Sequence, residues 1–201
     1  MVETKPLPRL DYGAWLRLEA ESDARTEYLR GEIYAMGGAA LRHGRIALNV
    51  GRRLDEATEG GPCRVYVSDT KVRIEAADAG FYPDVVVSSD PRDVGPLVLL
   101  YACLVIEVLS PSTAAYDRGL KFAAYRQLET LREYVIVEPD QIAVDVFRRG
   151  PEGTWTFRSY GEGEVVELES IGARVPVAQI YDRLPPVEAP APDMLGASPT
   201  R

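Results

Sequence analysis

The sequence predicts a mixed α/β (α+β) domain in which helices flank a mixed β-sheet and an antiparallel meander forms the C-terminal part. Runs rich in β-branched residues at 82–87, 104–109 and 133–137 are bounded by turn-forming residues, as buried strands are. Apolar residues recur at helical spacing over 40–58 and 114–128. Both kinds of segment alternate along one chain, which favours a sheet with helices packed on it.

The first part of the chain is predicted to form a helix, a hairpin and a second helix. Apolar residues spaced about four apart indicate a short amphipathic helix over 10–20. Residues 26–29 and 32–36 indicate two strands joined by a tight turn. Fourfold apolar spacing then predicts a helix over 40–58, which ends at the glycine and proline residues of 59–62.

The central part of the chain is predicted to be mostly strands, followed by one helix. Ser110 and Thr113 are hydroxyl residues suited to begin that helix by capping its free N–H groups. The predicted strands are 63–67, 71–74, 82–87 and 99–109, and the predicted helix is 114–128.

The last part of the chain is predicted to return to strands and then to lose regular structure. Residues 133–137 read as another central strand, and three further strands are expected to form the antiparallel meander, at 142–148, 154–160 and 164–168. We therefore predict a single domain over 1–184. The proline- and alanine-rich residues 185–201 are predicted to be a disordered tail.

The composition excludes several classes of protein. A chain of 201 residues with 46% hydrophobic residues can bury a real core. The formal net charge of −8 counts against a protein that coats nucleic acid through bulk electrostatics, although a local basic groove is compatible with it. Cys63 and Cys103 have no neighbouring cysteine or histidine, so they are expected to be reduced and packed. The N-terminus lacks a signal-peptide pattern and the apolar stretch 97–109 is too short to span a bilayer, which predicts a cytoplasmic protein and no membrane partner.

Two acidic residues stand inside strongly apolar strands. Asp84 opens the run at 82–87, and Glu107 lies within the run at 104–109. A carboxylate on a buried strand costs several kcal/mol unless a positive or hydrogen-bonding group meets it. If the two strands are neighbours, the carboxylates converge at the end of the sheet, where hard oxygen ligands suit Mg²⁺. A divalent ion there would activate water for phosphodiester hydrolysis.

Lys121 supplies a positive group on the following helix. It lies on one stripe with Asp117, Ala124 and Tyr125, so its side chain is predicted to point inward. A cation in that position would stabilise the charge that develops on a phosphate in the transition state.

The residues around these positions resemble the Uma2 family of the PD-(D/E)XK nuclease superfamily, over roughly residues 11–181. The string at 106–113 is the most specific part of the resemblance. The matching stretches are 82–84 (Tyr-Pro-Asp), 106–113 (Ile-Glu-Val-Leu-Ser-Pro-Ser-Thr), Asp117 with Lys121 and Tyr125, 133–137 (Glu-Tyr-Val-Ile-Val), 27–31 (Glu-Tyr-Leu-Arg-Gly), and 36–38 leading to His43.

The resemblance implies a restriction-endonuclease-like core that hydrolyses DNA with Mg²⁺, or with Mn²⁺ in its place. Asp84 and Glu107 would be the metal ligands, with the Val108 carbonyl as a third. The superfamily places its lysine two residues after the acid, where this chain has Leu109. Lys121 is therefore the candidate catalytic lysine.

Each candidate residue also has a structural interpretation. Asp84 after a proline suits a turn at the start of a strand, Glu107 suits a structural ion pair with an arginine, and Lys121 suits a simple pair with Asp117 four residues earlier. Glu27 suits either a solvated strand face or an accessory place in the site. His43, the single histidine, suits local hydrogen bonding or an accessory role.

Three functions are compatible with these residues. The leading one is a metal-dependent DNA endonuclease, and a twofold homodimer is the default expectation for an enzyme that cuts two strands. The alternative is a non-catalytic interaction protein that retains the nuclease fold, which the negative charge favours. The third is glycoside hydrolysis by a carboxylate pair, which the lysine and the family resemblance disfavour.

Overall fold

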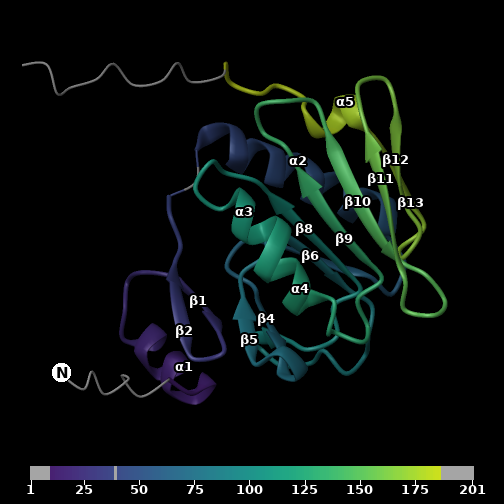
Figure 1. The fold of residues 1–201 in the computed structure, drawn as a ribbon. Coiled ribbons are helices and arrows are strands. Elements are labelled where there is room, and N and C mark those ends of the chain that lie inside the picture. The colour runs from purple at the N-terminus through teal and green to yellow at the C-terminus, as the bar shows by residue number, and fades with distance from the viewer. Residues whose placement is uncertain (1–9, 39, 187–201) are drawn as a thin grey trace, which may run out of the picture.

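The computed structural model describes residues 10–38 and 40–186 (Figure 1). The predicted tail from residue 187 onward lies outside the described residues. The helices are α1 (Tyr12–Ala20), α2 (Leu41–Thr58), the short 3-10 turn η1 (Glu75–Ala77), α3 (Ala114–Tyr116), the π-helical turn η2 (Asp117–Lys121), α4 (Phe122–Tyr125) and α5 (Val177–Ile180).

The strands form three sheets. A five-stranded sheet has the order β2-β1-β5-β4-β7, a six-stranded sheet has the order β11-β10-β9-β8-β6-β3, and β12 pairs with β13. The strands are β1 (Thr26–Leu29), β2 (Glu32–Ala35), β3 (Arg64–Val67), β4 (Lys71–Ile74), β5 (Ala79–Phe81), β6 (Val85–Ser88), β7 (Val98–Leu99), β8 (Leu104–Val108), β9 (Glu133–Val137), β10 (Val144–Arg149), β11 (Trp155–Tyr160), β12 (Val165–Leu168) and β13 (Ala173–Pro176).

The six-stranded sheet lies between two helical layers, which confirms the predicted mixed α/β architecture. In its centre β8 runs parallel to β9 and antiparallel to β6. Alternate residues of these strands pack on opposite sides, because successive side chains of a strand point to opposite faces. Val85 and Ile106 pack in the core on the α2 side, whereas Val86 and Val105 pack in the core on the α4 side. Figure 1 shows α3 and α4 crossing the sheet in front of β6 and β8.

The long helix α2 follows the predicted pattern. Ile46, Val50 and Leu54, spaced four residues apart, are all buried against the sheet. The helix ends at Thr58, whose hydroxyl donates to the Leu54 carbonyl, and Gly60 beyond it has a φ of +74°. A positive φ is inexpensive for glycine, so the chain turns away at this point.

The structure corrects the prediction of one strand over 99–109. Residues 98–99 form β7, which pairs with β4 in the five-stranded sheet, and only 104–108 form β8 in the six-stranded sheet. Just after β7, where the chain leaves the five-stranded sheet, the Asp93 carboxylate accepts the Leu100 N–H at 2.8 Å. Periodicity alone gave no sign of this change, since both segments are apolar.

The predicted helix over 114–128 is shorter and is interrupted. It ends at Tyr125, and its second turn, η2, is π-helical. A π-helical turn inserts an extra residue and changes which side chains share a face. In this case both ends of the turn, Asp117 and Lys121, are buried.

The C-terminal strands are antiparallel, as predicted, but the third one has a different partner. β10 pairs with β11, whereas β12 pairs with β13 and not with β11. Gly163, with a φ of +81°, turns the chain away after β11. The β12–β13 pair packs its buried residues into the core on the α2 side.

Strands β5 and β13 were not predicted. Within the described parts of the chain, no helix has the length and apolar character to cross a membrane.

Candidate active site

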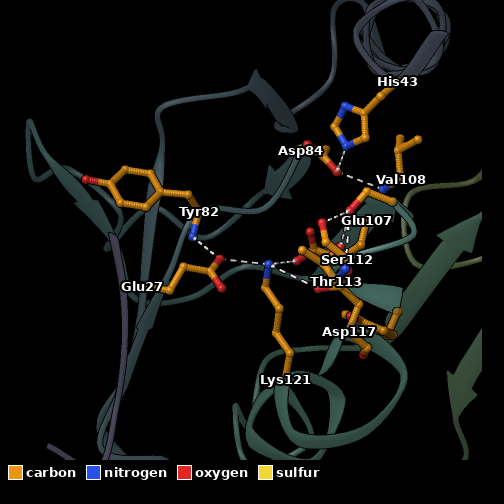
Figure 2. Close-up of polar contacts among 12 residues, drawn as sticks. Glu27, His43, Tyr82, Asp84, Glu107, Val108, Ser112, Thr113, Asp117 and Lys121 are labelled. Atoms are coloured by element: carbon orange, nitrogen blue, oxygen red, sulfur yellow. Dashed lines mark hydrogen bonds and ion pairs between the residues drawn. The ribbon is translucent and has the colours of Figure 1, made fainter. Parts of the chain in front are cut away.

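The ends of β6 and β8 bring the two predicted acids together. Val85 of β6 lies opposite Ile106 of β8, so continuing this antiparallel register by one residue places Asp84 beside Glu107. Lys121 approaches from η2, and Glu27 approaches from β1 in the other sheet (Figure 2). The site therefore combines three nearby segments, which carry Asp84, Glu107 and Lys121, with Glu27 from a distant strand.

Lys121 lies at the centre of an acidic cluster. Its Nζ atom lies 2.8 Å from Glu27 Oε1, 2.9 Å from Glu107 Oε1 and 3.7 Å from Asp117 Oδ1. Glu27, Glu107 and Lys121 are 5%, 3% and 4% exposed, so the cluster is closed to solvent on this side. The pair with Asp117 is the longest of the three contacts. The interpretation of Lys121 as only the partner of Asp117 is therefore wrong.

The pKa shifts show that negative charge is in excess around Lys121. Burial alone would lower the pKa of Lys121, but Glu107, Glu27 and Asp117 together raise it well above its usual value. The ammonium therefore keeps its proton at neutral pH. Burial raises the pKa of Glu107 well above its usual value, and the attraction of Lys121 offsets this only in part, because three other acids act in the same direction as burial.

The Glu107 carboxylate has an unmet hydrogen-bonding capacity. Its Oε1 atom is within ion-pair distance of Lys121 Nζ, yet it receives no aligned hydrogen bond from any described residue. The two observations agree, because an ion pair depends on distance and a hydrogen bond also depends on direction. Among the described residues this oxygen is therefore met by the charge of Lys121 and by no aligned hydrogen bond.

Asp84 is held by the backbone of β8 and by His43. Its Oδ2 atom accepts the Val108 N–H at 2.7 Å and lies 3.2 Å from His43 Nε2 (Figure 2). Burial would lower the pKa of His43, but hydrogen bonding and attraction to Asp84, together with a backbone hydrogen bond to Val108, raise it. His43 stands near the start of α2, so the first turn of that helix fixes the orientation of Asp84.

Glu27 joins the lysine to the segment that carries Asp84. Its Oε1 atom accepts the Tyr82 N–H at 3.1 Å and also contacts Lys121 Nζ. Tyr82 is two residues before Asp84 in the sequence. The interpretation of Glu27 as part of a solvated strand face is therefore wrong, because the side chain is buried and paired.

Two buried tyrosine hydroxyls lie near the cluster; the sequence pattern placed Tyr125 on the stripe of Lys121 but did not identify Tyr116. The hydroxyls of Tyr116 and Tyr125 are buried and have no hydrogen-bond partner among residues 10–38 and 40–186. Burial is the largest cause that raises both pKa values, and the charges of Glu27 and Asp117 add to it. The sequence signal for Tyr125 near the cluster was its spacing, four residues after Lys121.

Ser110 has a role in a turn, since its hydroxyl accepts the Thr113 N–H at 3.2 Å.

The donor set fits a hard divalent cation with few protein ligands. Within the described residues no group of three or more His, Cys, Asp and Glu side chains is arranged to hold a metal ion. Two carboxylates, Asp84 and Glu107, are nevertheless adjacent, and one oxygen of Glu107 lacks a hydrogen bond. Mg²⁺ is commonly bound through one or two carboxylates and keeps several waters. The residues present are therefore compatible with such an ion.

Comparisons with known proteins identify the family of the chain and its fold. The family model "Uma2: Putative restriction endonuclease" matches residues 12–178. Two uncharacterized proteins of Synechocystis sp. are similar: slr1290 is 37% identical over 88% of this chain and 93% of its own length, and sll1609 is 30% identical over 83% and 93%. A crystal structure described as a "putative nuclease belonging to DUF820" from Anabaena variabilis superposes with a TM-score of 0.73 at 16% identity, covering 86% of this chain and 97% of that one. This last likeness shows a shared fold.

Proposed function

Because the chain belongs to the Uma2 family of restriction-endonuclease-like proteins, we propose that it is a divalent-metal-dependent endonuclease that hydrolyses DNA phosphodiester bonds. One observation carries the proposal: Asp84, Glu107 and Lys121 converge at the ends of β6, β8 and η2. Two acids and a cation at one point are what hydrolysis of a phosphodiester with a metal ion requires.

Asp84 and Glu107 would hold the ion, with the Val108 carbonyl as a further ligand, and Mg²⁺ or Mn²⁺ would suit these oxygens. When bound, the ion supplies Lewis acidity and a water of lowered pKa. The side chains of Asp84 and His43 are 20% and 16% exposed, so solvent reaches the site on their side. That side is the route by which an ion and a phosphate would enter.

Lys121 would act on the substrate. Its ammonium is already protonated and is held by Glu27 and Glu107, so it needs no new proton to stabilise a developing phosphate charge. Glu27 would be a positioning residue, because it fixes both the ammonium and the Tyr82 N–H beside Asp84. His43 would orient Asp84 through their contact at 3.2 Å.

The test is plasmid nicking in Mg²⁺ and in Mn²⁺ by the wild type, Glu107→Gln and Lys121→Ala. We expect both variants to lose cleavage by about 10²-fold or more, in line with the loss of other groups that stabilise a transition state. Arg25→Met, which breaks an exposed ion pair with Asp69, is the matched control and should cut like the wild type. Absence of cleavage by the wild type with either ion would count against the proposal.

A second candidate function is a non-catalytic interaction protein that retains the nuclease fold. Two observations favour it: the formal charge is −8, and Lys121 already neutralises Glu107 in a cluster closed to solvent. Calorimetry with Mn²⁺ separates the two functions, because an endonuclease must bind the ion and this alternative need not. Heat of binding that disappears in Asp84→Asn would favour the enzyme.

A further inference from the structure

Strand β11 forms an open edge of the six-stranded sheet. It is the last strand in the sheet order, and among residues 10–38 and 40–186 its one partner strand is β10, in an unbroken register from Val144↔Tyr160 to Arg149↔Trp155. Residues 156–159 are all exposed, and the strand contains neither proline nor lysine. Proteins usually protect such edges with proline, with charged residues, lysine above all, or with a bulge. Here Arg158 is the one charged residue of the strand, so the edge is open to pairing with another strand.

The hydrogen bonds of the neighbouring strands show which backbone groups of β11 are free to pair. The Gly150 N–H points toward β11 and donates to the Thr154 carbonyl at 2.7 Å. The Arg149 N–H points the other way, toward β9, and donates to the Arg132 carbonyl at 2.8 Å. Because bonded pairs alternate along an antiparallel ladder, the even-numbered residues of β11 bond to β10. The N–H and C=O groups of Trp155, Phe157 and Ser159 therefore point away from the sheet.

Phe157 is an exposed aromatic residue at the end of a packed aromatic row. The residue is 58% exposed, and its ring centre lies 5.1 Å from that of Phe147, which in turn lies 4.7 Å from that of Phe122. Trp155 is on the same face, 5.3 Å from Phe122. A large apolar side chain that continues a core row into solvent marks a surface suited to an apolar partner.

We propose that β11 pairs antiparallel with β11 of a second copy of this chain, about a twofold axis through Phe157. In that register Phe157 faces its own copy, and Trp155 faces Ser159 of the other copy. The outward groups of these residues then exchange both of their hydrogen bonds, as a bonded antiparallel pair does. The two Phe157 rings extend the aromatic row across the axis, where paired side chains are about 5.5 Å apart.

The charge pattern of β11 is compatible with self-pairing. Arg158 is the only charged residue in the strand, and the twofold register places it opposite Thr156 of the other copy rather than opposite itself. Its guanidinium also lies 3.6 Å from Glu164 within its own chain. Like charges directly opposite each other would destabilise the pair, and this register avoids them. The inference does not depend on the proposed nuclease activity.

Sedimentation velocity over a range of concentrations tests the pairing. We expect the wild type to dimerise reversibly, because one strand pair buries a small interface. Phe157→Lys should remain monomeric at concentrations where the wild type is dimeric. Val94→Lys is the matched control, since Val94 is an apolar residue that is 81% exposed in a loop, and it should dimerise like the wild type. A monomeric wild type, or a dimer that persists in Phe157→Lys, overturns the proposal.

Cysteine cross-linking tests the register. In a Cys63→Ser background, Phe157→Cys places two thiols across the axis, about 5.5 Å apart between Cα atoms. Ser159→Cys places them about 13 Å apart along the strands, because the two copies are displaced in opposite directions by two residues each. A short bis-maleimide should join Phe157→Cys into a covalent dimer and leave Ser159→Cys uncoupled. Equal cross-linking of the two variants, or of neither, overturns the proposed register.

Discussion

Replacing Lys121 with methionine should strongly destabilise the metal-free protein. The substitution keeps a long apolar side chain and removes the charge that lies 2.8 Å from Glu27 and 2.9 Å from Glu107. Removing one partner of a buried ion pair costs about 3–5 kcal/mol, because the remaining charge stays buried without compensation. Domains are stable by about 5–15 kcal/mol, so for a protein near about 10 kcal/mol the variant would lose roughly a third to a half of the free energy of unfolding.

Urea denaturation followed by circular dichroism measures this loss. With an m value of about 2 kcal/mol per molar, the loss corresponds to a midpoint lower by roughly 1.5–2.5 M. The deficit should be larger at pH 8 than at pH 5. Burial raises the pKa of Glu107 in the folded state, and removing the attraction of Lys121 raises it further. The unfolded state therefore holds fewer protons, and stability falls as pH rises above about 4.5.

The exposed pair of Arg25 and Asp69 supplies the control. Its members are 51% and 75% exposed, so Arg25→Met should change the free energy of unfolding by less than about 1 kcal/mol. If Lys121→Met unfolds at the same urea concentration as this control, the ammonium of Lys121 does not compensate the buried acids, and the account of the cluster is wrong.

Three other predictions follow from single groups. Asp84→Asn should keep the metal-free melting temperature close to that of the wild type, because the amide oxygen can still accept the Val108 N–H. The same variant should lose the stabilisation by Mg²⁺. An equal metal-induced shift of the melting temperature in both proteins would contradict this prediction. Burial raises the pKa of Cys103 to about 11, so the thiol ionises in the unfolded state at a lower pH than in the folded state. The free energy of unfolding should therefore decline between about pH 9 and pH 11, and less steeply in Cys103→Ala. Identical pH profiles of the two proteins would refute the assignment. Glu133→Ala should lower the free energy of unfolding by about 3 kcal/mol, because its buried carboxylate lies 2.7 Å from Arg148. In the same urea titration Glu167→Ala, which breaks a surface pair with Arg174, should cost less than about 1 kcal/mol.

The strands and helices that carry a strong local pattern were predictable from the sequence. The spacing of apolar residues located α2, and β-branched runs located β8 and β9, because these elements bury whole faces and their sequences must follow the period of the element. Elements with weak local signals were missed. β5 has only three residues, and β13 carries an arginine on its exposed side.

The candidate residues of the site were also predictable, since an acid inside an apolar strand needs a local reason that stability does not supply. Asp84 and Glu107 stood out in this way, and Lys121 did so by lying on an apolar helical stripe. Their proposed roles as metal ligands and catalytic cation stay predictions. The sequence named Glu27 as an accessory candidate but left a solvated strand face open, because strand alternation alone allows either face to be buried.

The sequence by itself determined which residues are unusual, because unusual chemistry is visible at a single position. Only the tertiary structure decided which of them meet. The five-stranded sheet meets η2 where Glu27 of β1 contacts Lys121, and the π-helical turn buries Asp117 and Lys121 together. These contacts join residues separated by up to 94 positions along the chain, from 27 to 121, and their distances depend on strand order and helix packing. Local propensity carries no information about strand order or helix packing, since it acts only between near neighbours in sequence.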